Sequence, residues 1–143
     1  MSMVVSALVF VILLAISMAH LAWSCGLTYP IRDEKLLAQT VVGTANIEHM
    51  PPRWASFGVA VLTFSAGILA LALADHTGGG LPLSLAALPA SAIFVVRGAV
   101  GYTRWWAGQT PEPNFRLNDR RVYSPLCLAI GAGFLLLFLM RLL

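Results

Sequence analysis

Polar and aromatic side chains near the ends of the apolar segments are the residues of this chain that could form a binding site. Arg97 could bind an anion such as a phosphate or a carboxylate, because a guanidinium presents several donors in one plane. His20 could serve as an acid or a base, with Trp23 and Tyr123 lining a pocket. The candidate ligand-binding residues are His20, Trp23, Arg97, Tyr102, Arg104, Tyr123, Ser124 and Cys127.

A simpler interpretation accounts for the same residues. Tyrosine, tryptophan and arginine at helix ends form a belt at the membrane–water interface. Arg97 lies five residues before Tyr102, which is roughly 8 Å along a helix axis at about 1.5 Å per residue. Its guanidinium could therefore reach the interface, and His20 could face lipid headgroups. In the alternative interpretation, Arg97 points inward, with Gly101 and Arg104 on the same face, towards a polar pocket.

The elements that carry these residues are apolar segments of membrane-spanning length. The chain has 143 residues, of which 59% are hydrophobic and 10% charged, whereas soluble domains carry roughly 25% charged residues. Each apolar segment is close to the ~20 residues that a helix needs to cross a bilayer, and backbone groups in lipid must be satisfied internally. The sequence predicts a single all-α domain, 1–143, that forms a tight bundle of four transmembrane helices, about 3–23, 53–73, 82–102 and 124–143.

Basic residues are concentrated on one side of these four segments. The loops 24–52 and 103–122, with the helix ends that border them, carry Arg32, Lys35, Arg53, Arg104, Arg116, Arg120 and Arg121, whereas the opposite side carries Arg141. This bias predicts a multi-pass protein of the bacterial inner membrane with cytoplasmic long loops and periplasmic termini. Basic residues near anionic lipid contribute about 1 kcal/mol each. Membrane lipids are therefore the expected partners, and no nucleic-acid partner is predicted.

Helix-end signals refine the loop boundaries. Asp33 and Glu34, followed by leucines and then Gly43, predict a short capped helix in the first cytoplasmic loop, lying at the interface with its apolar face towards lipid. Ser124 is a suitable N-cap and Pro125 suits a first turn, so the last helix is expected to begin at Ser124.

Cofactor chemistry has little support in the sequence. Cys25 and Cys127 are far apart and form no Cys-x-x-Cys pair, which thiol–disulfide exchange enzymes typically use. Asp75 and His76 lack a third metal ligand. We expect no metal and no cofactor, and the sequence leaves open whether the protein is an enzyme.

The segment RRVYSPLCLAIGAGF, residues 120–134, carries a resemblance to a known family, together with Arg97-Gly98, Gly101-Tyr102, Phe115 and Asn118-Asp119. The chain resembles small bacterial inner-membrane proteins of unknown function with four predicted helices. In that family a His-x-x-Trp pair ends the first helix, here His20 and Trp23, and a Tyr-Ser-Pro-Leu-Cys-Leu motif opens the last, here residues 123–128. The resemblance implies the fold and the membrane location but no activity.

Two functions are compatible with these observations. In the first, residues from all four helix ends converge on one polar, aromatic pocket that faces the cytoplasm and binds a small anionic ligand or a lipid headgroup. In the second, the protein is a structural or accessory subunit of a membrane complex, or a homo-oligomer, without chemistry of its own. The arrangement of His20 and Arg97 distinguishes the two.

Overall fold

The computed structural model describes residues 1–143, and its regular elements are all helices. Four helices are long and apolar enough to cross a membrane: α1 (Ser2–Ser24), α3 (Arg53–Ala74), α4 (Gly80–Val100) and a continuous run, Pro113–Leu142, made of α6 (Pro113–Asn118), η1 (Asp119–Tyr123) and α7 (Ser124–Leu142). The four predicted spans are confirmed. The first three agree with their helices to within two residues at each end.

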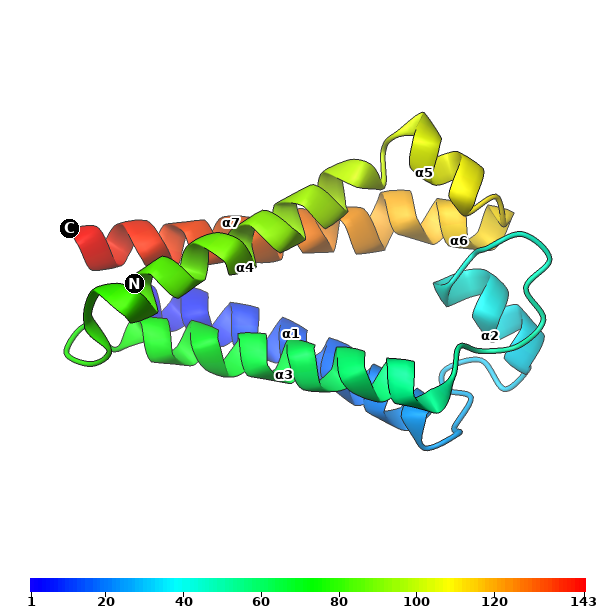
Figure 1. Ribbon diagram of the computed structural model, residues 1–143, viewed down its shortest axis with the longest axis horizontal. Helices are drawn as coiled ribbons and strands as arrows, with labels where there is room; N and C mark the ends of the chain where they lie inside the picture. Colours follow the sequence, from blue (N-terminus) through cyan, green and yellow to red (C-terminus); the bar gives the residue numbers. More distant parts are fainter.

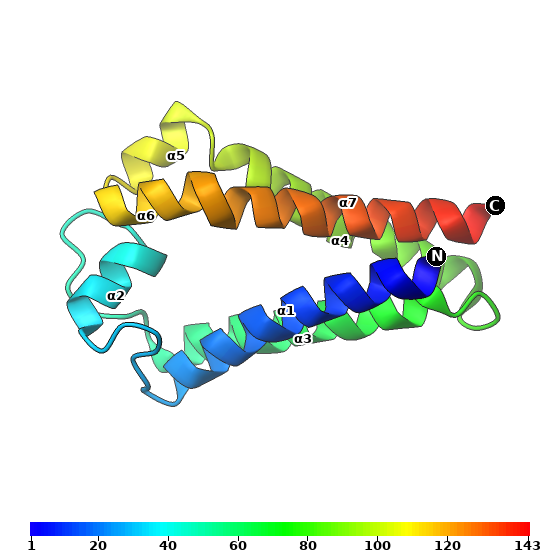
Figure 2. The same ribbon diagram turned by 180° about the vertical axis from the view of Figure 1, so that it is seen from behind.

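The short helices α2 (Glu34–Val41), α5 (Arg104–Gln109) and α6 gather at one end of the molecule. We call this the loop end. Both chain termini and the turn between α3 and α4 lie at the opposite end, the terminal end (Figures 1 and 2). All eight candidate binding residues belong to segments that reach the loop end.

The four long helices associate as two pairs. α1 packs along α3, and α4 packs along α7 (Figures 1 and 2). A buried serine joins the helices of each pair: the Ser17 hydroxyl donates to the Ala60 carbonyl at 2.8 Å, and the Ser91 hydroxyl donates to the Gly131 carbonyl at 2.8 Å. A Cβ on Gly131 would lie 3.1 Å from the Ser91 carbonyl oxygen. Glycine at position 131 therefore permits the close approach of α4 and α7.

The two pairs meet at the terminal end and diverge towards the loop end, where α2 lies between them (Figures 1 and 2). The hydrophobic core consists of buried residues from α1, α3, α4 and α7: Val9, Leu13, Ala70, Leu73, Ala87, Ile130, Phe134 and Leu137. The expected tight packing of all four helices therefore holds at the terminal end only, because other elements occupy the space at the loop end.

At the terminal end, Arg141 links α7 to α4, to the end of α3 and to the turn between them by hydrogen bonds. Its guanidinium donates to the Ser84 hydroxyl at 2.9 Å, to the Gly78 carbonyl at 2.7 Å, and to the carbonyls of Leu73 and Asp75. These carbonyls belong to the last turn of α3 and the turn that follows, where helix geometry leaves acceptors without intrahelical partners. In the same turn, the hydroxyl and the backbone N–H of Thr77 both donate to the Asp75 carboxylate. These two hydrogen bonds, chiefly the one from the hydroxyl, lower the pKa of Asp75.

Arg141→Ala is expected to lower the free energy of unfolding by about 2–3 kcal/mol, because it removes several hydrogen bonds from a charged donor. Arg141→Lys should restore only part of this loss, since an ammonium cannot reproduce the planar fork. Denaturant unfolding of the purified protein in detergent micelles measures both values. The exposed Arg121 is the control, because its replacement by alanine should change the stability by less than about 0.5 kcal/mol. Equal effects at the two positions would contradict this role for Arg141.

The predicted short helix in the first loop is confirmed as α2. The Asp33 carboxylate accepts a hydrogen bond from the Leu36 backbone N–H at 2.8 Å, and Gly43, with φ +76°, follows the C-terminus. The apolar face differs from expectation. Leu37 and Ala38 are fully buried within the protein, because α2 packs against α6 and not solely against lipid.

Helix α7 begins at Ser124, as predicted, but Ser124 does not cap it. Helix α6 and a π-helical turn, η1, precede Ser124 without a break. The Ser124 backbone N–H donates to the Asp119 carbonyl, five residues back, so Ser124 is an internal residue and no N-cap. The N-cap assignment was wrong because a serine followed by proline also fits a π-turn, in which the missing proline N–H is tolerated.

Candidate functional site

Arg97 forms a buried ion pair at the loop end of the α4–α7 pair. Its Nη2 lies 2.8 Å from Asp119 Oδ1, and Asp119 is only 2% exposed. Two further donors reach this carboxylate: the Trp106 indole N–H at 2.9 Å and the Ser124 hydroxyl at 3.2 Å. The Arg97 guanidinium also lies over the Trp106 ring, with its carbon 5.0 Å from the ring centroid. We call Arg97, Trp106, Asp119 and Ser124 the Arg97 network.

Two local features bring these residues together. The π-turn η1 places Asp119 and Ser124 so that the serine hydroxyl faces the carboxylate. Gly101 lets α4 approach, because a Cβ there would lie 1.8 Å from Ser124 Oγ and 2.9 Å from Asp119 Oδ2. In the π-turn, the Arg120 carbonyl faces Pro125, which has no N–H. The Tyr102 hydroxyl donates to this carbonyl instead, at 3.2 Å.

An aromatic cluster connects the Arg97 network to α2. Phe115 is 3% exposed, and its ring centroid lies 6.4 Å from that of Trp106 and 5.9 Å from that of Tyr123. The Tyr123 hydroxyl donates to the Thr40 carbonyl in α2 at 3.2 Å. Gly43 lies directly on the Phe115 ring, and its carbonyl accepts from the Glu112 N–H at 3.2 Å. The end of α2 is thus docked onto the α4–α7 pair.

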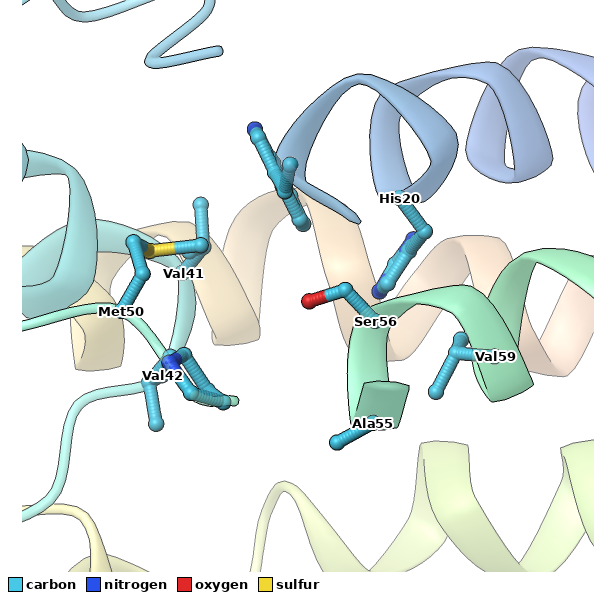
Figure 3. A pocket seen from close by; sticks show the side chains of 9 residues that line it. His20, Val41, Val42, Met50, Ala55, Ser56 and Val59 are labelled. Carbon is cyan, nitrogen blue, oxygen red and sulfur yellow. The ribbon is translucent and has the colours of Figure 1, made fainter. Parts of the chain in front are cut away.

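A pocket of about 150 Å³ lies on the other side of α2, against the α1–α3 pair (Figure 3). Its walls come from α1, from the end of α2, from the segment before α3 and from the first turns of α3. The lining residues are His20, Trp23, Val41, Val42, Met50, Pro51, Ala55, Ser56 and Val59. Six of these nine are hydrophobic, and none carries a fixed charge. We call this cavity the His20 pocket.

Two polar groups border the His20 pocket and point into it (Figure 3). The first is the His20 ring, whose Nδ1 hydrogen-bonds to the Ile16 carbonyl at 3.0 Å. The second is the Ser56 hydroxyl, on a residue that is 6% exposed. The hydroxyls of Ser17 and Ser91 bond to a neighbouring helix, whereas the Ser56 hydroxyl makes no such bond. Both groups are therefore available to a ligand.

Trp23 closes the pocket beside His20. Its ring centroid lies 4.7 Å from that of His20, and its indole N–H donates to the Tyr29 carbonyl at 2.6 Å. This hydrogen bond fixes the indole against the loop that follows α1. Trp23 therefore forms a wall of the pocket, while its indole N–H is occupied by the Tyr29 carbonyl.

The predicted convergence on one cavity was wrong. His20 and Trp23 line the His20 pocket, whereas Arg97 and Ser124 belong to the Arg97 network, and the two groups share no residue. Helix α2 lies between the two helix pairs (Figure 2). The remaining candidates lie around the network: Tyr102 and Tyr123 bond to backbone carbonyls, Cys127 is a half-buried free thiol, and Arg104 is exposed at the start of α5.

Asp119, Trp106 and Ser56 were not among the binding residues predicted from the sequence. A signal for Asp119 was present, because an arginine inside a membrane helix usually has a carboxylate partner. Asp119 is the acidic residue nearest the last span on the side of Arg97. Ser56 carried no signal of its own, since serine in a membrane helix usually packs or bonds to a backbone carbonyl. No group of three His, Cys, Asp or Glu residues in the structure is arranged to hold a metal ion.

The fold and these two sites define a helical membrane protein with four candidate spans. The chain belongs to the family described as protein of unknown function (DUF3995), whose profile matches residues 13–134. The matched range includes both His20 and the Arg97 network. Searches of curated proteins and of solved structures gave no significant match.

Proposed function

We propose that this protein is a multi-pass protein of the bacterial inner membrane that binds a lipid-like amphiphile in the His20 pocket. The charge distribution supports the orientation, because eight of the nine Lys and Arg residues lie at the loop end and only Arg141 lies at the other. This bias favours a cytoplasmic loop end and periplasmic termini. Trp54 and Trp105, which are 78% and 65% exposed at the loop end, have the positions of interfacial anchors.

The observation that carries the proposal is the composition of the pocket. Ligand sites are typically apolar cavities with a few convergent polar groups, and the His20 pocket has this character. A cavity of about 150 Å³ accommodates a group the size of benzene. This volume is too small for a whole lipid, and it fits the polar end and first carbons of an amphiphile whose remainder lies outside.

The Arg97 network does not offer the anion site expected from the sequence. The Asp119 carboxylate already pairs with Nη2 of Arg97, the guanidinium lies over the Trp106 ring, and its Nη1 is buried. A ligand anion would have to compete with a buried internal carboxylate. We therefore assign the network to the stability of the loop end and the ligand to the His20 pocket.

Filling the pocket tests the proposal. Ala55 lines the cavity, and Ala55→Phe adds a ring of about the volume available. We expect wild-type protein purified in mild detergent to retain an amphiphile, detected by mass spectrometry of the intact complex. Ala55→Phe should retain at least about tenfold less, which corresponds to a loss of ~1.4 kcal/mol of binding free energy.

The matched control is Ala99→Phe, an exposed position on α4, which should retain the wild-type amount. Wild-type protein without any bound amphiphile would contradict the proposal and favour the alternative of an accessory subunit. The same amount of amphiphile on Ala55→Phe as on the wild type would show that lipid associates elsewhere.

A further inference from the structure

We infer that the ligand of the His20 pocket is a fatty acid, held through its carboxyl group by His20 and Ser56. The inference rests on the proposed function and deepens it by naming the class of ligand. It follows from the hydrogen-bonding capacity of the two polar groups in the pocket and from the absence of charge in its lining.

The hydrogen bond from His20 to its own helix fixes what the imidazole offers to a ligand. The Ile16 carbonyl, 3.0 Å from Nδ1, can only accept a hydrogen bond, so Nδ1 carries the proton. In a neutral imidazole the other nitrogen, Nε2, is then an acceptor. The complementary ligand group must present a donor to Nε2.

Ser56 supplies the second half of the recognition. Its residue is 6% exposed and its hydroxyl borders the cavity. A hydroxyl that makes no hydrogen bond within the protein can donate one to a ligand acceptor, and such a bond contributes about 0.5–1.5 kcal/mol. His20 in α1 and Ser56 in α3 point towards the same space (Figure 3). Together they match a group that accepts from a serine and donates to a histidine.

A carboxylic acid carries both complementary groups, an acceptor and a donor, in one planar unit. Its carbonyl oxygen accepts from the Ser56 hydroxyl, and its O–H donates to His20 Nε2. Transfer of that proton to Nε2 gives a carboxylate beside an imidazolium, with the same hydrogen bond and no change in net charge. The hydrophobic side chains around the two groups, such as Val41, Val42 and Val59, suit the first carbons of an alkyl chain.

Phosphate headgroups suit this pocket poorly. No Lys, Arg, Asp or Glu lines it, and burying an anion that keeps its charge is costly without a countercharge. Phosphodiesters keep their charge at neutral pH and cannot donate a hydrogen bond to Nε2. A carboxylic acid avoids this cost through its own proton.

Equilibrium binding of radiolabelled dodecanoic acid to the full-length protein in maltoside micelles tests the inference. The unlabelled competitors are dodecanoic acid, methyl dodecanoate and dodecyl phosphate. We expect methyl dodecanoate to compete at least about tenfold more weakly than dodecanoic acid. The ester has no O–H, so its complex lacks the hydrogen bond to His20 Nε2 and leaves that nitrogen unpaired. Dodecyl phosphate should also compete more weakly.

Variants locate the binding. Ser56→Ala and His20→Phe should each weaken the binding of dodecanoic acid about fivefold to tenfold. Ser65→Ala is the matched control, because Ser65 is an exposed serine on the same helix, and it should stay within roughly twofold of the wild type. Thermal unfolding of each variant in micelles checks that the protein remains folded.

The outcomes separate this inference from the proposed function. Equal competition by methyl dodecanoate, or stronger competition by dodecyl phosphate, would overturn the fatty-acid assignment and leave amphiphile binding in place. Wild-type affinity in both Ser56→Ala and His20→Phe would also overturn it. Failure of every amphiphile to bind the wild type would overturn the proposed function itself.

Discussion

Asp119→Ala is expected to lower the free energy of unfolding by about 3 kcal/mol or more, because breaking a buried ion pair leaves an uncompensated charge. Breaking such pairs typically costs about 3–5 kcal/mol. Because the Arg97 side chain is 33% exposed whereas that of Asp119 is 2% exposed, water partly solvates the arginine, and we expect a loss near the lower end of that range. The indole N–H of Trp106 and the hydroxyl of Ser124 also lose their acceptor. Denaturant unfolding in detergent micelles measures the loss.

Removing both charges separates the ion pair from the packing around it. The double variant Arg97→Met with Asp119→Leu should recover most of the stability, because apolar residues of similar volume often replace a buried pair at little cost. Glu48→Ala is the control: Glu48 pairs with Lys35 on the surface, at 3.3 Å and with 65% of its side chain exposed, and such pairs contribute about 0–1 kcal/mol. An Asp119→Ala effect no larger than that of Glu48→Ala would contradict the buried network.

Gly43→Ala is expected to destabilise the protein by about 2–4 kcal/mol, through two effects at one position. The φ of +76° disfavours any residue with a Cβ by about 1 kcal/mol. The added Cβ would also lie 2.3 Å from Cγ of Phe115, and overpacking of this kind typically costs about 1–3 kcal/mol. Because Phe115 is 3% exposed, its ring has little room to move. Thermal unfolding in micelles checks the loss.

Phe115→Leu divides the two effects. In the Gly43→Ala background the smaller side chain should relieve the steric part and leave the backbone part. The control is Gly108→Ala in α5, where an added Cβ would meet no atom within 4 Å, and alanine should be neutral or slightly stabilising there. A Gly43→Ala variant as stable as Gly108→Ala would show that α2 is not docked on Phe115.

The helical spans could be predicted because lipid imposes them. The lengths of α1, α3 and α4 follow from apolar runs that must hydrogen-bond internally. The helical run that precedes Ser124 could not be predicted in this way. Helix ends are recognised by local caps, and Ser124-Pro125 resembles a start, whereas the helical run extends back to Pro113 and its Asp119 bonds to α4 and α5.

The candidate site was predicted only in part, because spacing along a chain does not specify the partner of a polar group. The sequence left Arg97 open between the interface and the protein interior, and it turns towards a carboxylate of its own chain. It left His20 open between lipid headgroups and a pocket, and His20 and Trp23 line a pocket. That Arg97 and His20 lie in different sites depends on how the two helix pairs diverge around α2, which requires the three-dimensional packing.

Because α2 lies between the His20 pocket and the Arg97 network, it has two roles. Val41 and Val42 form a wall of the His20 pocket, while Thr40 and Gly43 contact Tyr123 and Phe115 beside the Arg97 network. Phe115 and Tyr123 therefore hold α2 in place, the network ties their segment to α4, and α2 in turn completes the pocket. On this account the charged residues stabilise the ligand site without touching the ligand.

Photolabelling tests the location of the ligand site most directly. A dodecanoic acid with a diazirine near its carboxyl end is bound to the protein, irradiated, and its adducts are mapped by peptide mass spectrometry. We predict adducts on the pocket-lining residues of α1, α2 and α3 that unlabelled dodecanoic acid suppresses. Suppressible adducts on Arg97, Trp106 or Tyr102 instead, or adducts spread evenly over the exposed helix faces, would contradict a ligand site at His20.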